Sequence, residues 1–366
     1  RLARIWEELS VSSDYVDRRE AIAAFNAKST HLKRGIGFQP VKFGISFTAS
    51  VLNQAGALVL VYADGTIQLN HGGTEMGQGL HTKMLAVCAD AFGVSVDRVR
   101  AMNTRTDKIP NTSATAASSG SDLNGMAVAD ACAQIMARMK PVAADLLEAS
   151  VDDVVFADDV ARAGERTVGF SELATQCWLR QVSLHSAGFY RTPGIHYDHA
   201  TGRGEPFFYF AYGGAVVEVE VNGLTGEHRL RRVDVLHDVG NSLIPSIDIG
   251  QVEGAFAQGL GWLTSEEVIY DERGVLRTPG ASTYKVPAMG DIPADLRVAL
   301  LQRAPQDDTI HGSKAVGEPP FVLAIAAVTA LRQAIGGFGP AGHEVQLAIP
   351  ATPESILRAV VAAQSA

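Results

Sequence analysis

The spacing of apolar residues along the first 150 positions alternates between helical and extended patterns. Residues 1–30 carry apolar side chains at intervals of three and four, which predicts helical structure. Apolar residues at helical spacing also occur between residues 80 and 92, and Gly93 is a suitable helix terminator. A further helix is predicted over residues 124–149. Alternation predicts a strand over residues 66–70, and residues 41–51, 57–62 and 96–103 are also β-like.

The second half has a less regular start and a clearer end. Residues 150–204 contain turn signals but no clear period, and regularity returns with an alternating strand at residues 215–221. The turn at residues 222–226 predicts a partner strand and therefore a hairpin. Helices are predicted over residues 249–262 and 321–335, and the second is apolar almost all round, which predicts burial. Hairpins mixed with helices in this way predict an α+β fold.

The order of these elements occurs twice. In each half a hairpin leads through a glycine-bearing loop to a glutamine and a helix, with Gln78 and Gln251 in corresponding places. This weak internal repeat predicts repeated hairpin–helix units with mixed sheets. We therefore predict two α+β subdomains: residues 1–145, which include the N-terminal helical segment, and residues 146–366, which contain Glu318.

Composition argues against several classes of partner. The 366 residues are 46% hydrophobic and 19% charged, with a net charge of −9 and no long basic run, so a nucleic-acid surface is not expected. No apolar run approaches the roughly 18 residues that span a bilayer, so no membrane segment is expected. The chain begins with Arg1 instead of methionine, which suggests a piece of a larger protein whose earlier part is absent.

The three cysteines, Cys88, Cys132 and Cys177, lie far apart in sequence and form no Cys-x-x-Cys motif. Neither a zinc ribbon nor an iron–sulfur cluster can be assembled from this chain alone. Small core residues are a more ordinary interpretation of these cysteines than any ligand role. So few cysteines, in an odd number, favour a reducing cytoplasmic compartment.

The glycine-rich segment HGGTEMGQG, residues 71–79, separates a predicted strand from a predicted helix. Its glycines permit positive φ and a close approach of a ligand to the main chain. Free N–H groups in the first helical turn then predict an anion site, which suits a phosphorylated or otherwise anionic cofactor. The segment matches neither the nucleoside-triphosphate loop nor the dinucleotide fingerprint. On spacing alone, a plain structural turn is an equal alternative.

Two later segments also contain candidate chemistry. Residues 104–124 form a polar stretch of small residues, which is typical of a flexible surface loop but also of a loop that wraps a polar ligand. Glu318 precedes Pro319 and Pro320 at the start of the buried helix, and the proline biases it toward extended geometry. Its carboxylate is either a charge partner for the helix start or a general base.

Several ordered motifs resemble the molybdenum-binding part of the xanthine dehydrogenase family of molybdenum hydroxylases. They are GGTEMGQGLHTK at residues 72–83, TAAS at 115–118, GFYRTP at 188–193, DIGQVEG at 248–254 and KAVGEPP at 314–320. The resemblance extends over nearly the whole chain. It implies the C-terminal portion of that region, with both predicted subdomains contributing to a molybdopterin site.

The cofactor-binding residues implied by this resemblance are Met76, Gly77, Gln78, Ala117, Ser118, Gln251 and Gly317. Ala117 would lie near the molybdenum, which needs no protein side chain as a ligand because the dithiolene cofactor brings its own sulfurs. His71 and His81 are therefore expected to pack beside the site instead of binding metal. One departure is Gly120, where the family pattern has serine, and this removes one side-chain donor to the cofactor phosphate.

The resemblance also implies a reaction. Phe47 and Thr48 correspond to an aromatic clamp and a polar contact at the substrate, and Glu318 corresponds to the active-site base. The implied activity is hydroxylation of purines, from hypoxanthine to xanthine to urate, at a molybdenum centre. Electrons would then pass to 2Fe-2S clusters, FAD and NAD, which must lie on an absent segment or a partner subunit.

Further implied partners are the remaining half of the molybdenum-binding region and a second copy of the full assembly in a dimer. Two alternatives to purine hydroxylation stay open. One is an aldehyde oxidase of the same family, with a wider pocket. The other is a non-catalytic module that only holds or assembles the cofactor.

Overall fold

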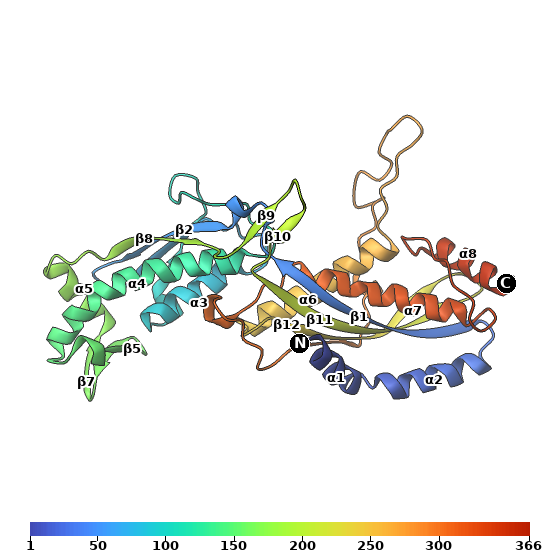
Figure 1. The fold of residues 1–366 in the computed structure, drawn as a ribbon, viewed down its shortest axis with the longest axis horizontal. Helices are drawn as coiled ribbons and strands as arrows, with labels where there is room; N and C mark the ends of the chain where they lie inside the picture. The colour runs from blue at the N-terminus through green and yellow to red at the C-terminus, as the bar shows by residue number, and fades with distance from the viewer.

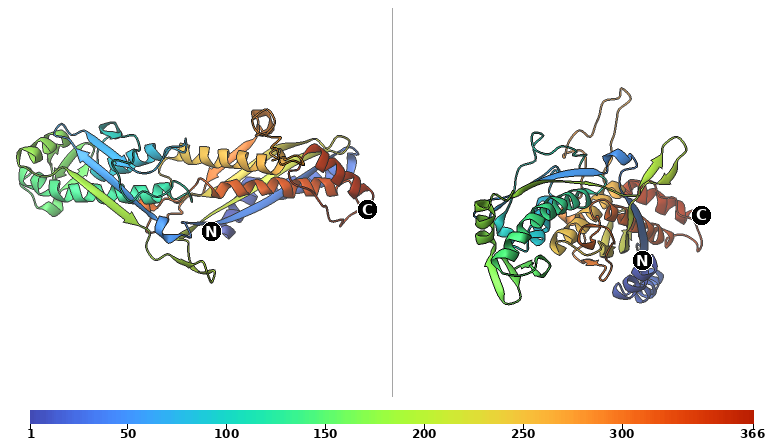
Figure 2. Two further views of the ribbon diagram at one scale, coloured as in Figure 1. Left: turned by 90° about the horizontal axis from the view of Figure 1, so that it is seen from above. Right: turned by 60° about the vertical axis from the view of Figure 1, so that its left-hand side comes forward.

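The structure is a computed structural model that describes all residues from 1 to 366. The molecule is elongated and has two lobes that meet near its middle (Figure 1). Each lobe contains a four-stranded mixed sheet covered by helices. Seen from above, the long covering helices run along the long axis of the molecule (Figure 2). The predicted α+β class is confirmed.

The first lobe is built on a sheet with the strand order β4-β3-β2-β8. Its strands are β2 (Gln54–Val61), β3 (Ile67–His71), β4 (Val99–Ala101) and β8 (His185–Arg191). Its helices are α3 (Leu80–Phe92), α4 (Gly120–Leu146) and α5 (Phe170–Leu179). A small outer sheet consists of β5 (Val155–Ala157), β6 (Val160–Ala163) and β7 (Arg166–Gly169). Strand β4 is shorter than the predicted strand over residues 96–103, because residues 96–98 form a 3₁₀ turn.

The second lobe is built on a sheet with the order β1-β11-β12-β13. Its strands are β1 (Leu32–Ile45), β11 (Tyr209–Asn222), β12 (His228–Asp238) and β13 (Leu296–Leu300). Its helices are α1 (Leu2–Ser12), α2 (Tyr15–Lys28), α6 (Pro245–Thr264), α7 (Ile325–Gly336) and α8 (Pro353–Gln364). A short hairpin of β9 (His196–Asp198) and β10 (Arg203–Glu205) precedes β11.

Both faces of the second sheet are covered. Val217 packs with the residues of α6 and α7, whereas its neighbour Val216 packs with Ile5 and Leu9 of α1. Successive side chains of a strand point to opposite faces, so the sheet lies between these two helical layers. This explains why no residue of β11 is exposed along the whole length of the strand.

The predicted repeat is present, with exchanged strands. Each large sheet has a hairpin, a strand parallel to the second hairpin strand, and a strand antiparallel to the first. In each lobe one helix follows the hairpin and another follows the parallel strand. Strand β1 precedes the first hairpin in sequence but pairs with β11 of the second. Strand β8 precedes the second hairpin but pairs with β2 of the first.

The two glutamines proposed as equivalents do not occupy equivalent positions. Gln78 lies before α3, whereas Gln251 lies inside α6. The equivalent residues are Lys83 and Asp248, each in the first turn of its helix. Their side chains meet where the lobes join, with Lys83 Nζ 2.5 Å from Asp248 Oδ1. The repeat is therefore marked by a buried ion pair between the two units.

Strand exchange also affects where the two hydrophobic cores lie in sequence. The first core runs from Ala55 to Leu184 and adds Ile310, and the second combines Val41 with residues between 215 and 363. The predicted boundary at residue 145 lies at the end of α4. It does not coincide with a change of core, because residues between Leu147 and Leu184 still pack in the first core and β8 still belongs to the first sheet. Each lobe is completed by a strand from the other half of the chain.

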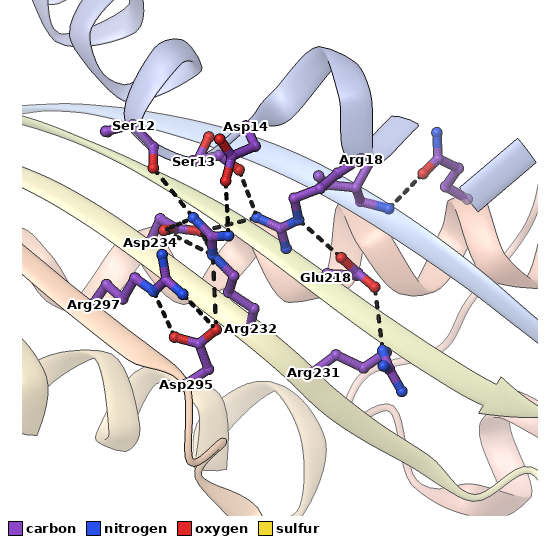
Figure 3. Close-up of polar contacts among 12 residues, drawn as sticks. Ser12, Ser13, Asp14, Arg18, Glu218, Arg231, Arg232, Asp234, Asp295 and Arg297 are labelled. Carbon is purple, nitrogen blue, oxygen red and sulfur yellow. Dashed lines mark hydrogen bonds and ion pairs between the residues drawn. The ribbon is translucent and has the colours of Figure 1, made fainter. Parts of the chain in front are cut away.

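The N-terminal helices are attached to the second sheet by a charged cluster (Figure 3). Arg18 of α2 contacts Glu218 and Asp234, each at 2.9 Å, across β11 and β12. Asp234 also pairs with Arg232 at 2.8 Å. Asp14 precedes α2 but does not cap it through its side chain, which instead pairs with Arg232 at 3.1 Å. Because these charges are mostly buried and mutually paired, they fix the position of α2 on the sheet.

One segment is more apolar than the sequence argument allowed. Pro319–Gly336 is 18 residues long with a mean hydropathy of 1.4, which meets the length and composition of a membrane span. Of this segment, 61% is buried within the protein. Its second part is α7, which packs against β1 and β11. The core helix of a soluble protein can have the same length and apolar composition, so these two properties alone do not indicate a membrane span.

Candidate cofactor and active site

A cavity of about 270 Å³ opens where the two lobes meet. It is lined by Met76, Gln78, Leu80, Lys83, Thr115, Ala116, Ser118, Gly120, Ser121, Gln251, Lys314, Ala315, Val316, Gly317 and Glu318. These residues come from four segments: the glycine-rich turn and α3, the small-residue loop and α4, the first half of α6, and residues 314–318. Because the segments belong to both units of the repeat, neither lobe forms the cavity alone.

The structure brings most of the predicted site residues to this cavity. Six of them line it: Met76, Gln78, Ser118, Gln251, Gly317 and Glu318. Gly77 and Ala117 belong to the same loops but do not line it. Phe47 and Thr48 follow β1 outside the cavity, where the Phe47 N–H donates to Asn53 Oδ1 at 2.8 Å. The roles assigned to all these residues stay predictions.

Glu75 occupies the position that the sequence argument left for an anionic ligand. Its Oε1 accepts hydrogen bonds from the N–H groups of Gly77 and Gly79, and its Oε2 accepts one from His81, each at 2.9 Å. Burial acts to raise the pKa of Glu75, but these donors outweigh it and hold the pKa below its ordinary value. The N-terminus of α3 therefore carries a carboxylate from its own loop, and the predicted anion site there stays a prediction.

Gln78 is also used within the glycine-rich turn. Its Oε1 accepts a hydrogen bond from the Met76 N–H at 2.5 Å, and its Nε2 donates to the Thr74 carbonyl at 2.8 Å. The Thr74 N–H donates to Thr115 Oγ1 at 2.9 Å, which joins this turn to the small-residue loop. Gln78 therefore shapes one wall of the cavity in addition to lining it.

The small-residue loop contains unusual backbone geometry. Ala117 and Ser118 both have φ of 54°, in the left-handed region that non-glycine residues rarely adopt. Each such residue costs on the order of 1–3 kcal/mol, and such strain is concentrated at functional sites. The Ser118 hydroxyl accepts a hydrogen bond from the Glu318 N–H at 2.8 Å. This bond joins the loop of the first lobe to the Glu318 segment of the second.

Glu318 is exposed at the cavity and begins a short helix. Its φ of −85° and ψ of −37° are helical, which corrects the extended geometry expected before a proline. The bond to Ser118 and a 3.1 Å bond from the Phe321 N–H to the Glu318 carbonyl hold it in that conformation. The 3₁₀ segment Pro319–Ala324 then leads into α7.

Two buried lysines of the cavity were not among the predicted site residues. Lys83 pairs with Asp248, and Lys314 Nζ lies 2.8 Å from Asp238 Oδ2 and 2.9 Å from the Phe210 carbonyl. Burial lowers the pKa of Lys314, although Asp238 acts to raise it. Both lysines lie within the quoted motifs, but only the fold shows that each is paired at the cavity wall.

The histidines of the glycine-rich turn pack against each other beneath it. The rings of His71 and His81 meet edge to face with centroids 4.9 Å apart. Burial, with a smaller contribution from His81, lowers the pKa of His71 to about 4, so its ring is neutral near pH 7. No group of three or more His, Cys, Asp or Glu side chains is arranged to hold a metal ion. The two histidine rings contact each other in this structure, and their expected role as packing residues stays a prediction.

Comparison with known proteins identifies the family of this chain. A family model described as a molybdopterin cofactor-binding domain matches residues 8–293. The chain belongs to that family. Xanthine dehydrogenase of Dictyostelium discoideum is 50% identical over 337 residues, which are 91% of this chain and 23% of that protein. Xanthine dehydrogenase/oxidase of Felis catus is 46% identical over 366 residues, 98% of this chain and 26% of that protein. The resemblance inferred from the motifs is confirmed.

Solved structures support the same fold. Quinoline 2-oxidoreductase from Pseudomonas putida 86 has a TM-score of 0.85 at 24% identity, over 98% of this chain and 46% of that chain. A reconstituted CO dehydrogenase from Oligotropha carboxidovorans has a TM-score of 0.85 at 20% identity, over 98% and 45%. These similarities establish the fold alone. The chain spans about a quarter of the curated relatives above and less than half of these structures.

Proposed function

We propose that this chain supplies one part of the molybdenum site of an enzyme that hydroxylates purines, with Glu318 as the general base. The observation that carries the proposal is that Gln78, Ser118, Gln251 and Glu318, from both lobes, line one cavity. Relatives that are 44–50% identical are described as xanthine dehydrogenases, which supports purines as the substrate class.

The donors at the cavity suit molybdenum–molybdopterin. They are the hydroxyls of Thr115, Ser118 and Ser121, the carboxamide of Gln251, and the two paired lysines. Neutral donors and small residues allow close contact with a phosphate-bearing organic group without a surplus of charge. When bound, that cofactor would supply the two-electron oxidation that hydroxylation of an electron-poor carbon requires.

The protein residues would position the groups and move the proton. Glu318 would accept a proton from the oxygen nucleophile that attacks the purine carbon, and general-base catalysis of this kind contributes about 100- to 10,000-fold. The Ser118 hydroxyl accepts a hydrogen bond from the Glu318 N–H and would thereby fix the backbone from which the Glu318 carboxylate extends. Two prolines directly after Glu318 restrict the same backbone further. Phe47 and Thr48, which follow β1, are proposed to contact the substrate.

Other components of the assembly are also proposals. Because the chain spans about a quarter of its curated relatives, other segments or subunits would supply the rest of the molybdenum site. We propose that 2Fe-2S clusters and FAD there take the electrons to NAD, and that the assembly is a cytoplasmic dimer.

Glu318→Gln in the complete enzyme tests the proposed role. Glutamine has nearly the same shape but cannot accept the proton, so purine turnover should fall by about 100- to 10,000-fold. Molybdenum and pterin content per chain should stay at the wild-type level. Glu267→Gln is a matched control, because Glu267 is exposed beyond the end of α6 and does not line the cavity.

The substrate assay should include hypoxanthine, xanthine and a panel of aldehydes. Wild-type enzyme that oxidises only aldehydes would identify an aldehyde oxidase. Protein that retains molybdenum and oxidises neither class would identify a cofactor-holding module. Wild-type turnover in Glu318→Gln would refute the assignment of the base.

A further inference from the structure

A buried acid lies at the start of α4, directly behind the cavity wall. Asp122 is 7% exposed, and its neighbours Gly120 and Ser121 line the cavity. Its Oδ2 accepts a hydrogen bond from the Tyr209 hydroxyl at 2.7 Å. Its Oδ1 is buried and has no hydrogen-bond partner. Such buried unsatisfied oxygens are rare in native structures and call for an explanation.

Tyr209 extends this contact into the second lobe. It is the first residue of β11 and is 5% exposed. Its hydroxyl oxygen accepts a hydrogen bond from the Ala315 N–H at 2.7 Å. A continuous path of two short hydrogen bonds therefore runs from α4, through β11, to the backbone three residues before Glu318.

We propose that Asp122 and Tyr209 are positioning residues, which hold residues 315–318 against the first lobe and thereby set the position of Glu318 at the cavity. The inference rests on the proposed function for the role of Glu318. The hydrogen-bonded path itself exists independently of that role.

Residues 315–318 are also held at two other points, Lys314 and Glu318, and the hydrogen bonds of Tyr209 hold the backbone between them. Lys314 is held within the second lobe by Asp238 and by the Val239 carbonyl, which accepts the Lys314 N–H at 2.7 Å. Glu318 is held by Ser118 of the first lobe. Between these two points, Ala315 is the residue whose N–H is bonded to a group tied to α4. Tyr209 therefore joins the anchored part of the second lobe to the first.

The chemistry of Asp122 agrees with a positioning role. Burial raises the pKa of Asp122 to about 7, although the Tyr209 hydroxyl and Lys83 act to lower it. Burial of an ionisable carboxyl group lowers the stability of the folded chain, so an apolar residue would be more stable at this position if packing were the only requirement. The hydroxyl of Tyr209 must both donate and accept, and a carboxyl oxygen provides the acceptor that orients it.

The experiment compares Tyr209→Phe with wild type in the complete enzyme. Phenylalanine keeps the ring but removes both hydrogen bonds. Amide hydrogen exchange of a peptide covering residues 313–318 should accelerate by about tenfold, because local opening is easier when an anchoring bond is lost. The kcat for purine should fall by about 10- to 100-fold, since small displacements of a catalytic group cost that much, while KM changes by less than about twofold.

Two further variants separate positioning from general destabilisation. Asp122→Asn keeps an oxygen that accepts the Tyr209 hydroxyl, so exchange and kcat should remain within about threefold of wild type. Tyr284→Phe removes another tyrosine–carboxylate bond, 2.6 Å to Glu266, outside the cavity lining, and should change neither quantity. Wild-type behaviour of Asp122→Asn would show that the path needs an acceptor oxygen at this position and not the carboxylate charge.

Each outcome supports or overturns the inference. Unchanged exchange in Tyr209→Phe would overturn it, whatever the activity. Faster exchange with unchanged kcat would also overturn it, since Glu318 would then be positioned by other contacts. If wild-type enzyme lacks purine activity, the proposed function fails by itself, and the exchange comparison still reports whether the path holds the segment.

Discussion

Replacement of Asp122 by asparagine should change how the stability of the chain depends on pH. Burial raises the pKa of Asp122 from its ordinary value of 3.8 to about 7. The folded chain therefore keeps this proton in a range where the unfolded chain releases it. Stability falls as pH rises from about 4 to about 7, and the full penalty is present above that range.

The size of the penalty follows from the two pKa values. A difference of about 3 units corresponds to about 4 kcal/mol at most, at about 1.4 kcal/mol per unit. Asparagine carries no proton to lose. The difference in the free energy of unfolding between variant and wild type should therefore be constant below pH 4 and grow in favour of the variant up to about pH 7.

Urea unfolding of both proteins at intervals between pH 4 and pH 8.5 measures this difference. Comparison at each pH is necessary because His71 and His237, whose pKa values burial lowers to about 4, add the opposite dependence. Both histidines are present in variant and wild type, so their contributions cancel in the difference. A pH-independent difference between the two proteins would refute the reasoning.

Three further variants test the packing and the glycine-rich turn. Gly188→Ala places a Cβ 2.0 Å from the Ala127 carbonyl oxygen, so it should destabilise the first lobe by about 3 kcal/mol in urea unfolding. Gly254→Ala, where a Cβ meets nothing within 4 Å, should cost nothing, and an equal loss in both would contradict the packing argument. Glu75→Ala removes the acceptor of three N–H groups at the start of α3 and should lower stability by about 1–2 kcal/mol, with less pterin retained. Unchanged stability and pterin content would show that the turn does not depend on this carboxylate.

The amino-acid sequence alone determined most of the local structure. Apolar periodicity correctly indicated the helices that became α3 and α6 and the hairpin of β11 and β12. A helical pattern depends on residues three or four positions apart, and a strand pattern depends on residues two positions apart. The long motifs around Gln78, Gln251 and Glu318 identified the family, and these residues line one cavity. Their spacing in sequence did not show how they meet.

Only the tertiary structure decided the arrangement of the repeat. Strands β1 and β8 each pair with the hairpin of the other unit, and pairing across 125 to 190 positions leaves no periodic signal in either strand. For the same reason Lys83 could not be matched with Asp248, and Asp122 could not be matched with Tyr209. Glu75 was assigned no role because the N–H groups it accepts from converge only after the turn has folded. Local patterns fix elements through near neighbours, whereas buried polar contacts depend on where distant elements finally meet.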